Sequence, residues 1–526
     1  MAAPTKTAPQ AHWTPNHNRW LIAVAVMLAT FMEVLDTSVA NVSLPHIAGN
    51  LSATTDEATW VLTSYLMANA IILPATNWLG QLFGRKRFLI ACIALFTLSS
   101  ALCGMANSLS FLIIARVLQG ASGGALQPIS QAVLLESFPP QKRGAAMAVF
   151  AMGVVVAPIL GPTLGGWITD NYSWRWIFYI NLPIGAAAAL MTNSVVEDPP
   201  YLQRIGLANI DYVGFGLLAI WLATLQYVLD KGQELDWFGS RAIVWCGVTS
   251  LFAFIGFIVR ELTADHPIVD LRVLKNRNFA VGATMILLLG ALLYGTTAIL
   301  PLFMQNLLGY TAIDAGFAMS PRGIGAFIMT IIVGRLVGKI SNRLLIGIGF
   351  VILSYSCVML SRINLQIGMS SIVIPIMTSG LAISLIFVPL TTSTMGTLTQ
   401  QQMGNATGIF NLMRNVGGSI GIAMITTLVS RGAQANQALL APHLSRFNPV
   451  MQQKLAAIEH GLAQHGSSWE ALKRAPRILY AMLQQQSALL SYVHNFQMFA
   501  LLCILTAPLV LLFKKVAKPT GPVAAH

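Results

Sequence analysis

The chain has 526 residues, of which 55% are hydrophobic and only 9% are charged. Soluble domains carry about 25% charged residues, so this composition indicates a protein that crosses a membrane many times as α-helices. The net charge of +13 does not indicate a nucleic-acid-binding protein, because the basic residues lie in short turns between apolar segments. The nine histidines and five cysteines show no metal-ligand spacing, and nucleophile-elbow and phosphate-loop motifs are absent from the sequence. We therefore expect no metal, no cofactor and no enzyme activity.

The apolar segments predict fourteen membrane-spanning helices, since a helix needs about 20 residues to cross the hydrocarbon core. The expected fold class is an all-α polytopic membrane protein. In chain order the expected spans are 20–44, 58–80, 88–106, 110–135, 144–167, 176–196, 212–229, 242–259, 279–304, 312–333, 344–361, 371–393, 404–429 and 496–513.

Basic residues in the turns predict the orientation, because Lys and Arg gather in the cytoplasmic loops of membrane proteins. The turns at 45–57, 105–109 and 305–311 carry no Lys or Arg. We therefore place these turns outside and both chain termini in the cytoplasm, while the links 197–211 and 394–403 are placed by counting alone. The basic turns lie at 85–87, 142–143, 272–277, 335–343 and 514–518.

A weak internal repeat relates two parts of the chain. The turn after the second span contains Gly84, Arg85 and Lys86, and the turn after the tenth span, at 334–343, is also basic and contains glycine. Repeats of this kind indicate two related helix bundles. We therefore expect two six-helix bundles joined by an inserted helix pair. The expected bounds are 1–196 for the first bundle, 197–278 for the pair and 279–526 for the second bundle.

Two carboxylates, Glu33 and Asp36, lie near the middle of the first span. A charge at this depth is costly and normally faces a protein interior or a water-filled cavity, and the i, i+3 spacing puts both on one helix face. They are candidate proton sites, Asp36 the stronger of the two. Arg116, early in the fourth span, lies at a similar depth, so we expect it to pair with Asp36. The alternatives are that Arg116 only neutralises Asp36 or extends toward the interface.

The fifth span carries small residues at every fourth position, Gly153, Ala157, Gly161 and Gly165, which form one flat face. Such a face lets another helix approach closely, and the prolines at 158 and 162 can kink the span. We expect a sliding or rocking contact here, with static packing as the alternative.

Other polar groups within the spans are candidates for a substrate cavity. Arg322 and Arg414 could face such a cavity or pair with carbonyl groups. Asn41, Gln127 and Asn411 could add polar cavity groups, with interhelical hydrogen bonding as the alternative.

Together these motifs resemble the major facilitator superfamily, within it the fourteen-span drug:proton antiporters, and most closely the Emr-type multidrug export permeases. The resemblance covers nearly the whole chain. The matching motifs are Leu35–Asn41 in the first span, Arg116 with Gln119–Gly120 in the fourth, Gly153 through Pro158, Gly161–Pro162 and Gly165–Gly166 in the fifth, and Trp174–Phe178 with Asn181–Pro183 at the sixth.

The resemblance implies alternating access of a central cavity between two bundles. Asp36 would bind a proton from outside and release it inside, and Arg116 would tune this exchange. It also implies a bacterial inner-membrane location, antibiotic resistance, and a tripartite efflux system with a periplasmic adaptor (membrane fusion protein) and an outer-membrane channel. The family's usual aspartate in the turn with Gly84, Arg85 and Lys86 is replaced by Gln81. Arg85 is therefore expected to pair with a helix C-terminus or another carboxylate.

Two alternatives to multidrug export stay open. A dedicated exporter of a single lipophilic metabolite, such as a fatty acid or siderophore, would share every motif. A membrane-embedded enzyme or receptor is more remote, because most loops are too short for a catalytic domain.

The polar segment 431–495 differs from the rest of the chain and is expected outside the cell membrane. Helical patterns are expected at 449–465, with a stripe of Val450, Leu455, Ile458 and Leu462, and at 469–490, where Pro476 interrupts or caps the helix. An exposed apolar stripe marks a partner surface, so we expect a docking element for the adaptor. The alternative is a tolerated insertion.

Overall fold

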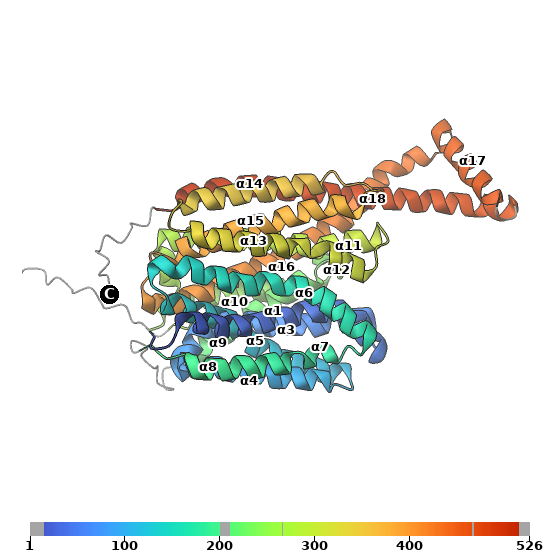
Figure 1. Cartoon of the computed structure of the whole chain (residues 1–526). Helices are drawn as coiled ribbons and strands as arrows, with labels where there is room; N and C mark the ends of the chain where they lie inside the picture. The colour runs from blue at the N-terminus through green and yellow to red at the C-terminus, as the bar shows by residue number, and fades with distance from the viewer. Residues whose placement is uncertain (1–14, 200–210, 266, 446, 465–467, 515–526) are drawn as a thin grey trace, which may run out of the picture.

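Long helices aligned along one direction make up the computed structural model (Figure 1). It describes residues 15–199, 211–265, 267–445, 447–464 and 468–514. Within them, eleven helices are long and apolar enough to cross a membrane, and a bent helix, α6 (Arg143–Asn171), makes twelve. The chain is thus a multi-pass, all-helical membrane protein, as predicted. The count of fourteen stays a prediction. The two remaining expected spans coincide with the helix α3 (Trp60–Phe83) and the short pair α7–α8, which are not among the helices that are long and apolar enough to cross a membrane.

The region Arg19–Val195, here called the N-half, begins with α1, whose first turn is capped by the Asn18 side chain. Helix α1 packs against α6, α8 and α5, and α3 packs along α5. The helices of the N-half are α1 (Arg19–Asn50), α2 (Thr55–Ala58), α3, α4 (Arg85–Gly104), α5 (Leu109–Ser137), α6, α7 (Trp176–Tyr179) and α8 (Asn181–Val195).

The region Arg277–Thr506, here called the C-half, repeats these pairings. Its first long helix packs along its fifth (α11 with α16), as α1 does with α6, and its second along its fourth (α13 with α15), as α3 does with α5. The two halves meet where α6 contacts α13 and where α16 contacts α3 and α5. The helices of the C-half are α11 (Arg277–Asn306), α12 (Ala312–Met319), α13 (Pro321–Leu336), α14 (Asn342–Leu360), α15 (Met369–Met395), α16 (Gln400–Leu440) and α18 (Ser468–Thr506).

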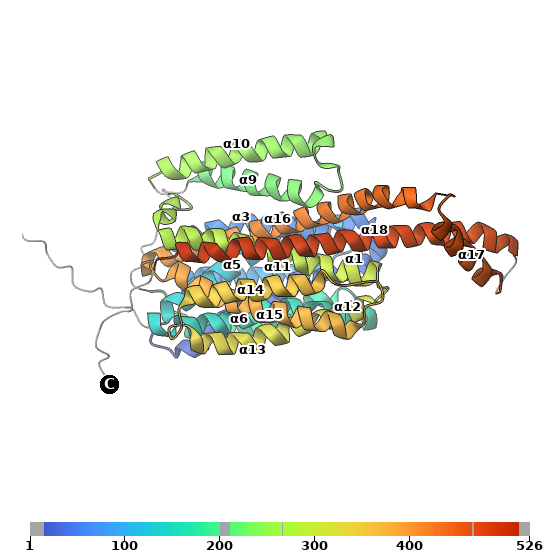
Figure 2. The same ribbon diagram turned by 90° about the horizontal axis from the view of Figure 1, so that it is seen from above.

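Two helices between the halves, α9 (Tyr212–Lys231) and α10 (Arg241–Thr263), form a hairpin along one side of the molecule (Figure 2). Helix α9 contacts both α3 and α16, so the hairpin lies beside one of the seams between the halves. Lys231 donates to the hydroxyl of Thr59 at the start of α3, and the Trp237 indole donates to Thr427 on α16.

One end of the bundle, here called the terminal end, holds the start of α1 and the end of the last helix. Trp20 packs edge-on against Phe138 after α5, and Arg343 in the first turn of α14 donates to the carbonyl of Phe513. The basic turns predicted for the cytoplasmic side that are described, at 85–87, 142–143, 272–277 and 335–343, belong to this end. Lys515 and Lys518 lie outside the described residues.

The opposite end carries a helical projection rather than a loop. Helix α16 continues to Leu440, α17 (Pro449–Ala463) lies at the far end of the projection, and α18 starts at Ser468 and returns to the bundle (Figure 1). The helix expected at 449–465 is present over Pro449–Ala463 with Gln464 as its C-cap, while His465 lies outside the described residues. The expectation that Pro476 interrupts the next helix is wrong, because α18 runs through it. Pro476 removes the partner of the Leu472 carbonyl, but both residues are exposed, so water can satisfy that group.

Candidate functional site

A buried ion pair joins α1 to α5 inside the N-half. Arg116 Nη1 lies 2.6 Å from Asp36 Oδ2, and the two residues are 0% and 2% exposed. The other Asp36 oxygen accepts hydrogen bonds from Gln119 Nε2 at 2.9 Å and Asn181 Nδ2 at 2.7 Å. Arg116 Nε donates to the Val61 carbonyl at 3.0 Å. The carboxylate is therefore compensated by one positive charge and two amide donors. Removing any of these groups leaves the buried charge less well compensated, which is destabilising.

Sequence reasoning found Asp36 and Arg116 from their depths along two helices, but it assigned no role to Asn181. Asn181 opens α8 and is fully buried, and its amide also donates to Ser100 Oγ at 2.9 Å. The signal was present, because an asparagine interrupts an apolar segment there. Its target could not be read without knowing that α8 packs on α1.

Glu33, one turn before Asp36 on α1, accepts hydrogen bonds from three side chains. Tyr65 Oη and Asn69 Nδ2 lie 3.2 Å from its Oε1, and Gln127 Nε2 lies 2.6 Å from its Oε2. Glu33 is 5% exposed and takes part in none of the ion pairs among the described residues. Its charge thus depends on neutral donors from α3 and α5.

The same polar groups connect the two halves. Gln127 Oε1 accepts a hydrogen bond from Arg414 Nη2, and Asn69 Oδ1 lies 3.5 Å from Asn415 Nδ2. One turn away, Asn411 Nδ2 donates to Gln131 Oε1 at 2.7 Å. Arg414 is only 3% exposed. A belt of polar side chains therefore runs from Glu33 on α1 across α3 and α5 to α16.

Two residues of the predicted substrate cavity lie elsewhere. Arg322 is buried within the C-half, where its guanidinium donates to Thr297 at 2.5 Å and to Ser379 at 3.1 Å. Asn41 is exposed on α1. The structure therefore brings Gln127, Asn411 and Arg414 together and separates Arg322 and Asn41 from them.

The small-residue face of α6 lies against α1, within the N-half. An added Cβ at Gly153 would lie 2.8 Å from Met27 Cγ, and one at Gly165 would lie 3.0 Å from the Val39 carbonyl oxygen, so the helices touch closely. Gly166 is buried too. The helix bends by 41° between Pro158 and Thr163.

The bend has a local cause. Proline has no backbone N–H, so Pro162 cannot pair with the carbonyl of Pro158 one turn earlier, and Ser38 Oγ donates to that carbonyl at 3.1 Å instead. The side chain of Pro162 lies outside the described part. A side chain of α1 thus completes the hydrogen bonding of α6 at its bend.

At the terminal end, Arg85 and Glu136 form an ion pair whose side chains are 4% and 2% exposed. Glu136 lies in the last turn of α5. It provides the carboxylate expected to pair with Arg85, because Gln81 replaces the family's usual aspartate. Gly84, with φ of 86°, adopts a conformation that favours glycine, and the Lys86 backbone donates to Asp198 Oδ1 at 2.8 Å.

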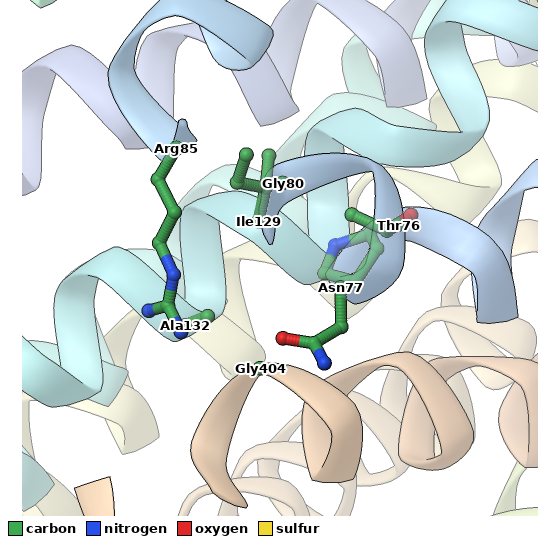
Figure 3. Close-up of a pocket in the computed structure, with 8 residues that line it drawn as sticks. Thr76, Asn77, Gly80, Arg85, Ile129, Ala132 and Gly404 are labelled. Atoms are coloured by element: carbon green, nitrogen blue, oxygen red, sulfur yellow. The ribbon is translucent and has the colours of Figure 1, made fainter. Parts of the chain in front are cut away.

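Arg85 also faces the C-half. It points toward Asn77 and toward Gly404 on α16, and together they line a small pocket (Figure 3). A Cβ added at Gly404 would lie 3.0 Å from Arg85 Nη2, so α16 approaches this pair closely. The buried ion pair therefore lies on the seam between the halves.

Glu136→Gln is expected to lower the free energy of unfolding by about 3–5 kcal/mol, because it leaves the Arg85 charge buried without its counterion. Thermal unfolding of the purified protein in detergent measures this. The double variant Arg85→Leu/Glu136→Leu removes both charges and is expected to recover most of the loss. A double variant as unstable as the single one would show that the pair is not the cause.

Comparisons with known proteins agree with this geometry. A family model described as the Major Facilitator Superfamily matches residues 26–422. The "Multidrug export protein EmrB" of Escherichia coli (strain K12) is 41% identical over 457 residues, which cover 86% of this chain and 88% of that protein. The "Fatty acid resistance protein FarB" of Neisseria gonorrhoeae is 39% identical over 452 residues, which cover 85% and 87%.

Among solved structures, the crystal structure of the human organic anion transporter MFSD10 (TETRAN) covers 93% of this chain and 100% of its own, with a TM-score of 0.57 and 12% sequence identity. That likeness is one of fold alone. The family model and the relatives near 40% identity confirm the resemblance drawn from the motifs, and they are transporters rather than enzymes. The chain therefore belongs to the major facilitator superfamily of membrane transporters, and its sequence is similar to the EmrB-type members.

Proposed function

We propose that this chain is a proton-coupled antiporter that exports lipophilic compounds across the bacterial inner membrane by alternating access. The observation that carries the proposal is the buried Asp36–Arg116 pair, whose neighbour Glu33 connects to the C-half through the polar belt. Ionisable residues this deep in a membrane protein usually mark ion or substrate pathways. The name of the EmrB relative supports several drugs as substrates.

In this proposal, Asp36 takes a proton from outside and releases it inside, with Glu33 as the second carboxylate. A protonated Asp36 no longer compensates Arg116, whose Nη1 then keeps the Gln119 Oε1 at 2.8 Å as an acceptor. The free energy of this rearrangement couples proton binding to the relative position of α1 and α5. The repeated helix pairings support the division into two six-helix bundles, with α9–α10 as the inserted pair, that rock about the seams.

The simplest test uses purified protein in proteoliposomes. Imposing a proton gradient should drive accumulation of a lipophilic dye, and adding the dye to protein in weakly buffered detergent solution should release protons. Dye transport that ignores the gradient would contradict proton coupling.

A fatty acid exporter is the second candidate, because the relative named for fatty acid resistance is nearly as similar as the multidrug relative. A substrate panel decides between them. Transport of cationic dyes as well as long-chain carboxylates supports multidrug export, whereas transport of carboxylates alone supports the dedicated exporter.

We further propose that the terminal end is cytoplasmic and the α17 end periplasmic, since the basic turns gather at the terminal end. Alkaline phosphatase is active only in the periplasm. A fusion after Gln464, at the end of α17, is expected to be active, and one after Thr520 inactive. Activity of both fusions, or of neither, would contradict this orientation.

We also propose that the projection formed by α16, α17 and α18 docks a periplasmic adaptor of a tripartite efflux system. Part of the apolar stripe of α17 is covered, since Leu455, Ile458 and Leu462 are half-buried and α17 packs on α18. Large apolar side chains remain outside it, with Phe447 94% and Trp469 66% exposed. Exposed apolar groups of this kind on a projecting element support a partner surface.

A further inference from the structure

Two side-chain amides connect Glu33 to α16 in the same way. Gln127 donates its Nε2 hydrogen to Glu33 and accepts from Arg414 through its Oε1. Asn69 donates its Nδ2 hydrogen to Glu33, and its Oδ1 lies 3.5 Å from Asn415 Nδ2. Each amide therefore has its nitrogen toward the carboxylate of the N-half and its oxygen toward α16 of the C-half.

The chemistry of the partners fixes the orientation of Gln127. An ionised carboxylate can only accept hydrogen bonds, and a guanidinium can only donate them. Gln127 satisfies both because one end of its amide donates and the other accepts. The hydrogen bond from Arg414 to Gln127, which joins the halves, thus requires the Glu33 oxygen that faces Gln127 to be an acceptor.

Protonation of Glu33 changes what this side offers. A proton on Oε2, the oxygen that faces Gln127, turns that oxygen into a donor, and Gln127 can accept from it only by turning its amide oxygen toward Glu33. Gln127 turned in this way presents its NH2 group to the guanidinium of Arg414. Two donors then face each other in a buried site. The hydrogen bond between Gln127 and Arg414 is lost, and the NH2 group and the guanidinium are left without an acceptor there.

The charged and titratable groups around Glu33 come from several helices. Helix α8 carries no charged residue, and the charged residues of α6 stand only at its two ends. The groups facing Glu33 are Asp36 on α1, Tyr65 on α3 and Arg414 on α16, and Arg116 on α5 is the partner of Asp36. Asp36 and Arg116 compensate each other, so Arg414 is the cation whose partner depends on the state of Glu33.

We propose that Gln127 and Asn69 are positioning residues that transmit the protonation state of Glu33 to α16, holding the two halves together while Glu33 is charged and releasing Arg414 when Glu33 takes a proton from water. This deepens the proposed proton-coupled transport, on which it rests, by naming the groups that join the proton site to the moving half. Protonation of a carboxylate on α1 then weakens a hydrogen bond that joins α5 of the N-half to α16 of the C-half.

The structure provides a matched control. The bond from Asn411 Nδ2 to Gln131 Oε1 crosses between the same two helices, α16 and α5, one turn from Gln127. Gln131 is buried, as Arg414 is, but it is not among the hydrogen-bond donors to Glu33 in the described structure, which are Tyr65, Asn69 and Gln127. Gln131→Met therefore removes a comparable bond between the halves and leaves the link to Glu33 intact.

The test measures the distance between the halves without substrate. Spin labels at Gln141, in the turn after α5, and Gln401, at the start of α16, are both exposed at the terminal end. The background carries Cys246→Ser, since the other four cysteines are buried. Electron–electron double resonance on the purified, full-length protein then gives the fraction of separated halves at each pH.

The parent is expected to show a larger separated fraction at low pH than at high pH. Glu33→Gln and Gln127→Met should both abolish this pH dependence, and Asn69→Ala should reduce it. In Gln127→Met the separated fraction at high pH should equal that of the parent at low pH. Gln131→Met should raise the separated fraction at every pH and keep the midpoint of the parent.

Three outcomes would overturn the relay: a parent that does not respond to pH, full pH dependence in Gln127→Met, or loss of it in Gln131→Met as well. Loss in Glu33→Gln with full dependence in Gln127→Met would leave Glu33 as a sensor but remove the amides. Failure of proton-driven transport is detected separately, since the proteoliposome experiment measures flux and this one measures distance.

Discussion

Asp36→Asn is expected to reduce proton-driven export to background while the protein still inserts in the membrane. Asparagine keeps the size of the side chain, and its oxygen can still accept from Asn181 or Gln119, but it carries no titratable proton. It also leaves the Arg116 charge buried without its counterion, which costs about 3–5 kcal/mol of stability. We therefore expect a lower unfolding temperature together with loss of gradient-driven dye transport in proteoliposomes.

The double variant Asp36→Asn/Arg116→Gln separates these two effects. It removes both charges, so it should regain most of the lost stability and still lack proton-driven export. If the double variant regains transport together with stability, Asp36 acts only as the counterion of Arg116.

Variants of Arg116 test the other side of the pair. Lysine keeps the charge but cannot donate from a planar fork to Asp36, Gln119 and the Val61 carbonyl together. We expect partial transport from Arg116→Lys and almost none from Arg116→Ala. An alanine variant with the transport rate of the parent would remove Arg116 from the mechanism.

The Asp36–Arg116 pair could be predicted because its signal is local. Depth along a helix follows from residue count at 1.5 Å per residue, and a charge inside a span needs a partner at the same depth. The positions of the helices could be predicted as well, because an apolar segment is also a local signal. The Arg85 partner was constrained too, because a buried arginine at the end of a span leaves few carboxylates within reach.

The polar belt could not be assembled in this way. Gln127 and Arg414 are 287 positions apart, and nothing in either segment states that α16 packs on α5. Each residue alone is also explained by ordinary hydrogen bonding between helices, so the sequence left their roles open. Arg322 shows the same limit, because its partners, the hydroxyls of Thr297 and Ser379, lie on other helices of the C-half.

Replacing residues 434–486 with a short Gly/Ser linker is expected to abolish drug resistance in cells while leaving transport by the isolated protein intact. The structure shows why the shortened chain can close. Asn436 on α16 donates to the Ser487 carbonyl on α18, and Ser491 Oγ donates to the carbonyl of Val429, so the two helices run side by side where the cut is made. The proton site lies in the N-half, and no residue of the removed segment contacts it within the described structure.

The measurement compares two assays on the same variant. Dye-triggered proton release by purified protein should match that of the parent, whereas co-purification of the adaptor and growth in the presence of drug should be lost. Point variants then locate the contact: Phe447→Ser with Trp469→Ser removes two exposed apolar groups, and Gln453→Ala, an exposed polar position on α17, serves as the control. Because exposed apolar groups contribute binding energy that an exposed glutamine does not, only the first pair should weaken adaptor binding. If the shortened protein still recruits the adaptor, the binding surface must lie on the bundle itself and the projection is a tolerated insertion.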